Sequence, residues 1–443
     1  MSNGSHYQKL KGLVDDGRLS MHLIIAPPRT NSSLVEHVMG NSPDIHHECH
    51  EPFLGARQDD FDPDHGYKQI FESIGGEQFE HSMEKTSVAV KEMSHWIGKN
   101  EEYTRLVELT RNPILILVRN PLLSVESRIR RVVSTLDMRS SIDLQRAMLD
   151  YVATERGFSK WCDFLIAIKS GAYAKPLDFI RNGEDIDRLY DTSILSVQNE
   201  LLNFKARKNG YSNWRDLVER KLYAECDYIF FEDILKANPR RMSFEKDEFK
   251  RLDEEVRYLE SAGKKHFVFD TTDIRAAPEE QLRELCSRIG ITFSPEMLEW
   301  GQKPVDFHSE QTQEFEKLWY DTLLSSSRVK PPIEVPLPLK RFPQFMRQYL
   351  STDNLGIYAE LSRRKTLGGE LWHELNECEF NIPVTVENRE RLLELGVIGE
   401  DVSPGTEASV KLKYIDPIYA IRMSQSCQRM LSLRSLSERM QMR

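Results

Sequence analysis

The chain has 443 residues with an apolar share of 40% and a charged share of 29%, which predicts a soluble globular protein large enough for two domains. Its formal net charge of −10 argues against a general nucleic-acid binder. The six cysteines have no paired spacing, which fits neither a zinc site nor a disulfide framework and suits a reducing compartment. Because the first residues lack a signal-peptide core and no apolar run approaches a membrane span, we expect a cytoplasmic protein with no membrane partner.

Apolar runs along the chain predict buried strands. Four runs are clear, and a fifth is a further candidate: His22–Ala26, Ser87–Val90, Ile114–Val118 and His266–Phe269, then Tyr228–Phe231. Helical patterns lie between them, for example at Ser32–Met39, Pro121–Val133 and Pro278–Ile289. Since the runs are apolar throughout and alternate with helices, they favour an α/β fold with a parallel sheet between two helical layers. Ligands of such sheets bind at the carboxyl ends of the strands.

The composition along the chain predicts three parts. Residues 1–330 form the main α/β domain, and a helical insertion at about 134–263 is suited to selecting a substrate because it is rich in charged and aromatic residues at helical spacing. A proline-rich stretch at 331–343 predicts an extended linker. Residues 344–443 form a C-terminal appendage of unknown role, whose basic last part is either a solvated helix or an interaction arm.

A short loop follows the first strand and opens a helix: Pro27, Pro28, Arg29, Thr30, Asn31, Ser32 and Ser33. A helix that begins here aims its backbone N–H groups and positive dipole end at the loop, and Arg29, Ser32 and Ser33 add side-chain donors for an oxyanion. The alternative is an ordinary N-cap in which Thr30 or Ser32 closes the helix. The Gly-Lys-Ser/Thr of the ATP-binding loop is missing, which disfavours a metal-dependent phosphoryl transferase.

A second candidate anion site follows the run Ile114–Val118. Arg119, Asn120 and Pro121 come directly after the strand, and Ser127 lies eight residues after Arg119, about two turns into the next helix. The arginine can fold back over the helix and share an anion with the serine. The alternative is a strand-end salt bridge for Arg119 and an ordinary helix serine at Ser127.

Together, PPRTNSSL (27–34) and RNPLLSVES (119–127) resemble the two nucleotide motifs of the sulfotransferases, P-loop-like α/β enzymes that use 3′-phosphoadenosine-5′-phosphosulfate (PAPS). HEPF (50–53), KEM (91–93) and LRELCSRIGITFSPEMLEW (282–300) resemble segments of the bacterial and fungal branches, so the resemblance covers about residues 20–325. It implies a 5′-phosphosulfate site at Pro28, Arg29, Thr30, Asn31, Ser32 and Ser33, and a 3′-phosphate site at Arg119 and Ser127. Asn31 stands where the family usually has glycine, and asparagine tolerates the left-handed backbone that such a turn needs.

The resemblance implies transfer of a sulfuryl group from PAPS to a hydroxyl or amine of a small-molecule or carbohydrate acceptor, without a metal. Arg29 would stabilise the charge on the leaving oxygen, and the acceptor needs a general base. Three base candidates follow from position: Glu51 after a strand-end segment, His95 where cytosolic members carry a catalytic histidine, and His50 beside Glu51. Lys91 is a candidate contact to the sulfonate or the acceptor, with a plain salt bridge as the alternative.

Trp300, Lys303, Trp319 and Tyr320 are candidates for the acceptor wall or an adenine cap. Core packing is the alternative for the aromatic residues, and a solvated charge is the alternative for the lysine. Two other functions stay open: a kinase-like nucleotide phosphotransferase and a non-catalytic binding module of the same fold. The sequence leaves the identity of the acceptor and the oligomeric state open, a homo-oligomer included.

Overall fold

The computed structural model describes residues 5–54, 62–94, 100–172, 195–237, 248–300, 321–330, 341–343, 345–346, 357–358, 361, 376–384, 386, 389 and 401–414. Its centre is a five-stranded sheet in the order β2-β3-β1-β4-β5, with every neighbouring pair parallel. The strands are β1 (Leu19–Ala26), β2 (His47–His50), β3 (Thr86–Met93), β4 (Ile114–Val118) and β5 (His266–Asp270). The predicted α/β class with a parallel sheet is therefore confirmed.

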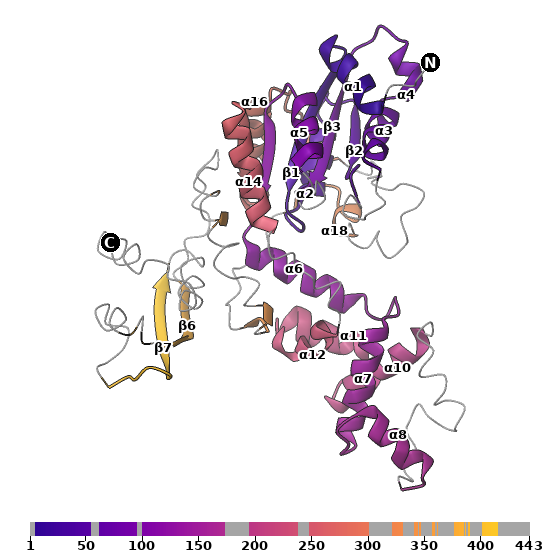
Figure 1. The fold of residues 1–443 in the computed structure, drawn as a ribbon, viewed down its shortest axis with the longest axis vertical. Coiled ribbons are helices and arrows are strands. Elements are labelled where there is room, and N and C mark those ends of the chain that lie inside the picture. Colours follow the sequence, from indigo (N-terminus) through magenta and orange to yellow (C-terminus); the bar gives the residue numbers. More distant parts are fainter. Residues whose placement is uncertain are drawn as a thin grey trace.

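Helices cover both faces of this sheet (Figure 1). One face packs on α1 (His6–Asp15), α3 (Pro63–Ser73), α5 (Asn100–Leu109) and α14 (Glu248–Ser261). The other face packs on α2 (Ser32–Gly40), α15 (Thr271–Ala276) and α16 (Pro278–Ile289). Successive residues of β4 alternate between the two layers and all five are buried, which explains why its sequence is apolar throughout.

The strand β2 is the one that hydropathy does not mark. Its sequence is HECH, and of its four residues only Cys49 is fully buried. It lies at the edge of the sheet, where one side is open to solvent, so polar residues are tolerated there. Its register is nevertheless fixed, because His50 pairs with Lys91 of β3.

The chain leaves the sheet in opposite directions from two adjacent strands. From β1 it runs through α2 to β2 on one side, and from β4 it continues to β5 on the other side. The carboxyl ends of β1 and β4 therefore lie side by side at the point where the winding reverses. Crevices at such points are where open α/β sheets bind their ligands.

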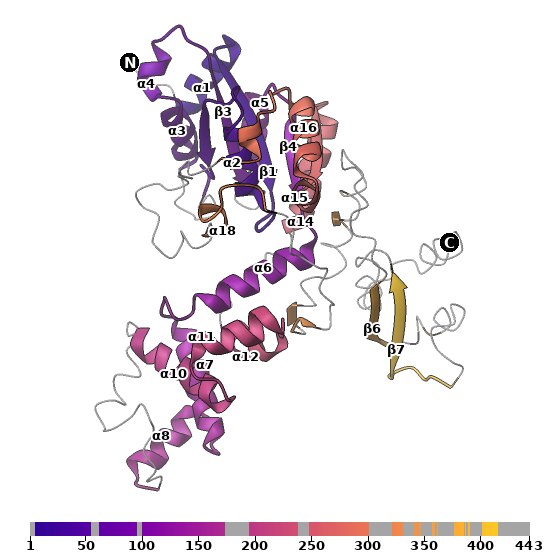
Figure 2. The ribbon, with the colours of Figure 1, turned by 180° about the vertical axis from the view of Figure 1, so that it is seen from behind.

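A helical part leaves the sheet after β4 (Figures 1 and 2). It begins with α6 (Pro121–Ser134) and returns to the sheet through α14, which contacts α5 where the Tyr103 hydroxyl donates to the Glu255 carbonyl. Between them lie α7 (Ile142–Glu155), α8 (Trp161–Lys169), α10 (Leu195–Lys208), α11 (Trp214–Leu217), η1 (Val218–Ala224), η2 (Ile229–Phe231) and α12 (Glu232–Lys236). None of the helices in the described ranges has both the length and the hydropathy that a membrane span needs.

The predicted strand at Tyr228–Phe231 is wrong. Residues Ile229–Phe231 form the short 3-10 helix η2, which leads into α12. Tyr228 and Phe231 are fully buried whereas Ile229 is 44% exposed, so the buried positions are three residues apart. That spacing is helical, and the short apolar run alone did not distinguish it from a strand.

Residues after position 330 also enter the core. Phe342 is fully buried and stacks on Tyr228, although it lies in the predicted linker. Tyr358 is buried and its hydroxyl donates to Asp270 at the end of β5 over 2.7 Å. Farther along, β6 (Asn376–Pro383) and β7 (Glu407–Tyr414) form a separate antiparallel pair, apart from the five-stranded sheet (Figure 2). The remaining short elements are α4 (Gly76–Glu80), η3 (Pro295–Met297) and α18 (Asp321–Leu324).

Candidate active site

The loop after β1 has an unusual backbone for residues with side chains. Arg29 has φ 64° and Asn31 has φ 57°, so both lie in the left-handed region that glycine usually occupies. Thr30 between them is fully buried, and its hydroxyl donates to the Pro27 carbonyl over 2.7 Å. Turns of this kind point successive N–H groups into one concavity, which is how many proteins bind anions. Left-handed non-glycine residues cost free energy and are concentrated at functional sites.

The N-terminus of α2 is not closed by a side chain. Asn31 is its N-cap residue, its side chain makes no capping hydrogen bond, and the hydroxyl of Thr30 is turned back to Pro27. The N-cap by Thr30 that the sequence left open is therefore not formed. At α6 the reverse holds, because the Asn120 side chain accepts from the Leu122 amide over 3.0 Å. Of these two helix starts, α2 is the one whose orphan N–H groups can meet a ligand.

The second motif contacts the first loop directly. Nη1 of Arg119 donates to the Arg29 carbonyl over 2.9 Å, and the Ser124 hydroxyl lies 3.4 Å from the same oxygen. In return, Nε and Nη2 of Arg29 lie 3.2 and 2.9 Å from the hydroxyl of Ser127. Arg119 is 2% exposed. The structure therefore brings the loop after β1 and the start of α6 together at the switch point of the sheet.

The other predicted loop residues fall into two groups. Pro28 and Ser32 are buried, whereas Ser33 and Asn31 are partly exposed. The amide nitrogen of the Asn31 side chain is nevertheless buried, and it has no hydrogen-bond partner among the described residues. A buried donor of this kind is rare unless a ligand or water completes it. With Arg29 and Arg119 beside it, the donor set suits an anion with more than one phosphate-like group.

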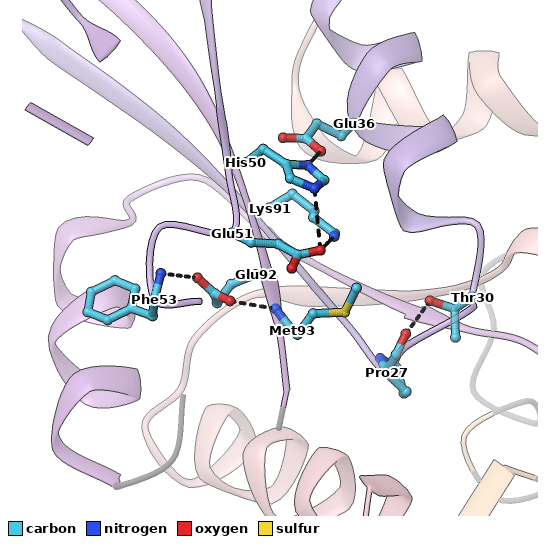
Figure 3. Close-up of polar contacts among 9 residues, drawn as sticks. All are labelled: Pro27, Thr30, Glu36, His50, Glu51, Phe53, Lys91, Glu92 and Met93. Carbon is cyan, nitrogen blue, oxygen red and sulfur yellow. Dashed lines mark hydrogen bonds and ion pairs between the residues drawn. The ribbon is translucent and has the colours of Figure 1, made fainter. Parts of the chain in front are cut away.

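A chain of ionisable side chains lies beside this loop, at the ends of β2 and β3 (Figure 3). Glu51 follows β2 and has φ 47°, a third left-handed residue, and its amide donates to the Lys91 carbonyl over 2.8 Å. Its Oε1 pairs with Nζ of Lys91, which is fully buried, and lies 3.4 Å from Nε2 of His50. Nδ1 of His50 lies 2.5 Å from Oε2 of Glu36 on α2. Two carboxylates and two basic groups thus alternate along one line.

Glu92 lies on the other face of β3 from Lys91. It accepts hydrogen bonds from the amides of Phe53 and Met93 over 2.9 and 2.8 Å. Burial raises the pKa of Glu92 to about 8, and the charge of Glu51 adds to the rise. This carboxyl binds the backbone two residues after Glu51 and two residues after Lys91.

Some predicted residues are placed elsewhere or lie outside the described ranges. Trp300 is buried, donates through its indole N–H to the Ser326 carbonyl over 2.9 Å and packs its ring edge-on against His37. The Trp300 side chain therefore packs against α2, which is the core-packing alternative given for this residue. The base candidate His95 lies outside the described residues, as do Lys303, Trp319 and Tyr320.

The structure also adds site residues that the sequence did not single out. These are Ser124, Glu36 and Glu92. Glu36 carried a usable signal, because it is a carboxylate inside the apolar run of α2. Ser124 had no such signal, since its role depends on where the Arg29 carbonyl points. In the described ranges, no three His, Cys, Asp or Glu side chains cluster as metal ligands would.

A comparison with family models gives an independent identification. Residues 260–364 match the model described as Sulfotransferase domain. This segment includes β5, α15 and α16. It contains neither the loop after β1 nor the start of α6, so the family match and the two sequence motifs are separate observations. The match over residues 260–364 supports a sulfotransferase family, so the predicted resemblance is confirmed at the level of the family. Searches of curated proteins and of solved structures gave no match.

Proposed function

We propose that the protein is a PAPS-dependent sulfotransferase that acts on a hydroxyl or amine of a small-molecule or carbohydrate acceptor. The observation that carries the proposal is the contact between Arg119 and the Arg29 carbonyl, next to a helix start without a side-chain cap. A sulfuryl donor with phosphate groups at two positions of one ribose needs two anion-binding sites that one nucleotide can reach at the same time. The contact between the two strand ends at the switch point supports two such sites.

The residues present fit such a nucleotide. The N–H groups at the start of α2, Ser32, Ser33 and the buried Asn31 amide would hold the 5′ group, and Arg119 with Ser127 would hold the 3′-phosphate. Arg29 lies between the two sites through its contacts to Ser127. When bound, PAPS supplies the sulfuryl group and a bisphosphate as leaving group.

Glu51 is the general base in this proposal. Its carboxylate lies at the end of β2, and Lys91 pairs with it from β3. Glu51 takes the proton of the acceptor hydroxyl as the new bond to sulfur forms. Arg29 and the loop N–H groups stabilise negative charge on the leaving oxygen. His95 and His50 stay as alternative bases, and Lys91 as a contact to the sulfonate or acceptor.

The organisation of the chain is part of the proposal. The helical part after β4 would select the acceptor. The family match runs to residue 364, and Phe342 and Tyr358 are buried against the core. We infer from this that the sulfotransferase unit extends beyond residue 330, to about residue 364, and that the appendage begins after it. A cytoplasmic location and the bacterial or fungal branch remain predictions.

Labelled-sulfate transfer tests the proposal. The wild-type protein, incubated with [35S]PAPS and the small-molecule fraction of a cell extract, should yield labelled products. E51Q should lower the rate about 100- to 10,000-fold and leave the affinity for adenosine 3′,5′-bisphosphate unchanged. The exposed E72Q on α3 is the matched control. Magnesium-dependent ATP turnover without any response to the bisphosphate would instead identify a kinase-like enzyme. Bisphosphate binding without transfer to any acceptor would identify a binding module.

A further inference from the structure

The pair Glu36 and His50 lies behind the proposed base. His50 is the last residue of β2, and each of its ring nitrogens faces a carboxylate (Figure 3). Nδ1 lies 2.5 Å from Oε2 of Glu36, and Nε2 lies 3.4 Å from Oε1 of Glu51. The same Glu51 oxygen pairs with Lys91. The side chains of Lys91 and His50 therefore converge on one oxygen atom.

Glu36 is a buried carboxylate whose side chain contacts the His50 ring. It is fully buried on α2, where its neighbours Val35, Val38 and Met39 pack on the sheet. Its Oε1 is buried and has no hydrogen-bond partner within the described ranges, so its only strong contact there is the one from Oε2 to His50. Burying a carboxylate with so few partners costs stability. Residues that cost stability in this way are often kept for function.

The hydrogen bonds that a histidine ring can make then assign one partner to each nitrogen. An ionised carboxylate can only accept, so Glu36 selects the ring form that carries a proton on Nδ1. Nε2 is then the nitrogen that faces Glu51. We propose that Glu36 and His50 form a positioning pair: Glu36 fixes the ring, and Nε2 of His50 holds the Glu51 carboxylate beside Lys91.

This inference rests on the proposed function, in which Glu51 is the base. It gives His50 a different role from the one in which it takes the acceptor proton itself. With Nδ1 directed at Glu36, Nε2 is the ring nitrogen that contacts Glu51, and the proposal predicts that kcat depends on both His50 and Glu36.

Among the described residues, charged groups face the ring from both of its sides. Glu36 faces it from α2, Glu51 directly follows the end of β2, and Lys91 faces Glu51 from β3. Cys49 precedes it, and burial raises the pKa of this thiol well above its usual range, so Cys49 stays uncharged. Glu92 accepts from the Phe53 amide, two residues beyond Glu51, and burial raises its pKa to about 8. Activities of the variants are therefore compared at one pH, so that the titration of Glu92 does not enter the comparison.

Two measurements on the full chain test the positioning pair. The first is nitrogen-15 NMR of the histidine rings, with the His50 signals assigned by their loss in H50Q. We expect a protonated Nδ1 in the wild type and a shifted Nδ1–H signal in E36Q. The exposed H65Q and E72Q on α3 are matched controls and should leave the His50 signals in place. A ring that is protonated on Nε2 alone would overturn the proposal, whatever the activity.

The second measurement is the rate of [35S]PAPS transfer into the pooled small-molecule extract at one fixed pH. H50Q and E36Q should each lower kcat about 10- to 100-fold, the rate equivalent of one hydrogen bond to a charged group, with the KM for PAPS unchanged. A purely structural change would not confine its effect to kcat, and the exposed E72Q should leave both constants unchanged. Wild-type transfer with unchanged kcat in H50Q and E36Q overturns the positioning pair alone. The absence of wild-type transfer overturns the proposed function, and with it the reaction that the pair would serve.

Discussion

The guanidinium of Arg119 at the end of β4 donates a hydrogen bond to the carbonyl oxygen of Arg29 in the loop after β1, over 2.9 Å. These residues are 90 positions apart in the chain and come from adjacent parallel strands. The contact commits the Arg29 carbonyl to Arg119 and ties the loop after β1 to the end of β4.

The left-handed turn at Asn31 gives a stability prediction. N31A should lower the free energy of unfolding by about 1 kcal/mol, because alanine tolerates φ 57° less well than asparagine. N31G should be at least as stable as the wild type, since glycine adopts this conformation without steric cost. Urea unfolding of the three proteins measures the difference. Equal stability of N31A and N31G would show that the backbone at this position is not strained.

Glu92 predicts a pH dependence of stability. Its pKa rises from an ordinary 4.5 in the unfolded chain to about 8 in the fold, so the folded state binds the extra proton between these values. Its favourable contribution is complete below about pH 4.5 and is lost as pH rises toward 8, by about 1.4 kcal/mol per pH unit within that window.

The E92Q variant isolates this effect. Glutamine does not titrate, so the free energy of unfolding of E92Q should fall less steeply between pH 5 and 8 than that of the wild type. The absolute stability of E92Q is not the readout, because an amide offers one acceptor oxygen to the two amides of Phe53 and Met93. Parallel curves for the two proteins would contradict a raised pKa at Glu92.

The buried pair of Lys91 and Glu51 predicts a double-mutant cycle. K91M should destabilise the fold by about 3 to 5 kcal/mol, because it leaves the buried Glu51 carboxylate without its ammonium partner. Adding E51Q should restore part of that loss. K68M, which removes an exposed partner of Glu72, should change stability by less than about 1 kcal/mol. The pairing would be refuted if K91M and K68M had equal effects in denaturant unfolding.

Tyr358 tests whether the chain beyond residue 330 belongs to the core. Y358F removes the 2.7 Å hydrogen bond to Asp270 and should lower the free energy of unfolding by about 1 to 3 kcal/mol. Y223F changes a 40% exposed tyrosine and is the control, with an expected effect within about 0.5 kcal/mol. If Y358F unfolds at the same denaturant concentration as the wild type, this segment adds nothing to the sulfotransferase unit.

Hydrophobic runs predicted the sheet because four of its strands are buried on both faces. β4 was predicted with the bounds that the structure has, and β1, β3 and β5 extend beyond the predicted runs. The edge strand β2 could not be found this way, since its sequence HECH is polar. The apolar run at Tyr228–Phe231 was assigned to the wrong element because a run of four residues has no resolvable period.

The positions of the loop after β1 and of the start of α6 were predictable because motif and strand end coincide in the sequence. The left-handed conformation of Asn31 was also expected from its residue type, and the structure has it. The left-handed Arg29 and Glu51 were not expected, since arginine and glutamate rarely adopt this conformation. The line from Glu36 to Lys91 depends on the register of β2 against β3 and on the face that α2 presents, and short sequence patterns do not carry that information.

Calorimetric titration with adenosine 3′,5′-bisphosphate and with adenosine 5′-monophosphate tests the central claim, that two strand ends bind the two phosphates of one nucleotide. The wild type should bind the bisphosphate at least about 100-fold more tightly, the equivalent of about two charge-assisted hydrogen bonds. In R119K/S127A this preference should collapse, whereas R111K with S170A, both on the exposed surface, should keep it. Equal affinity of the wild type for the two nucleotides would contradict the claim.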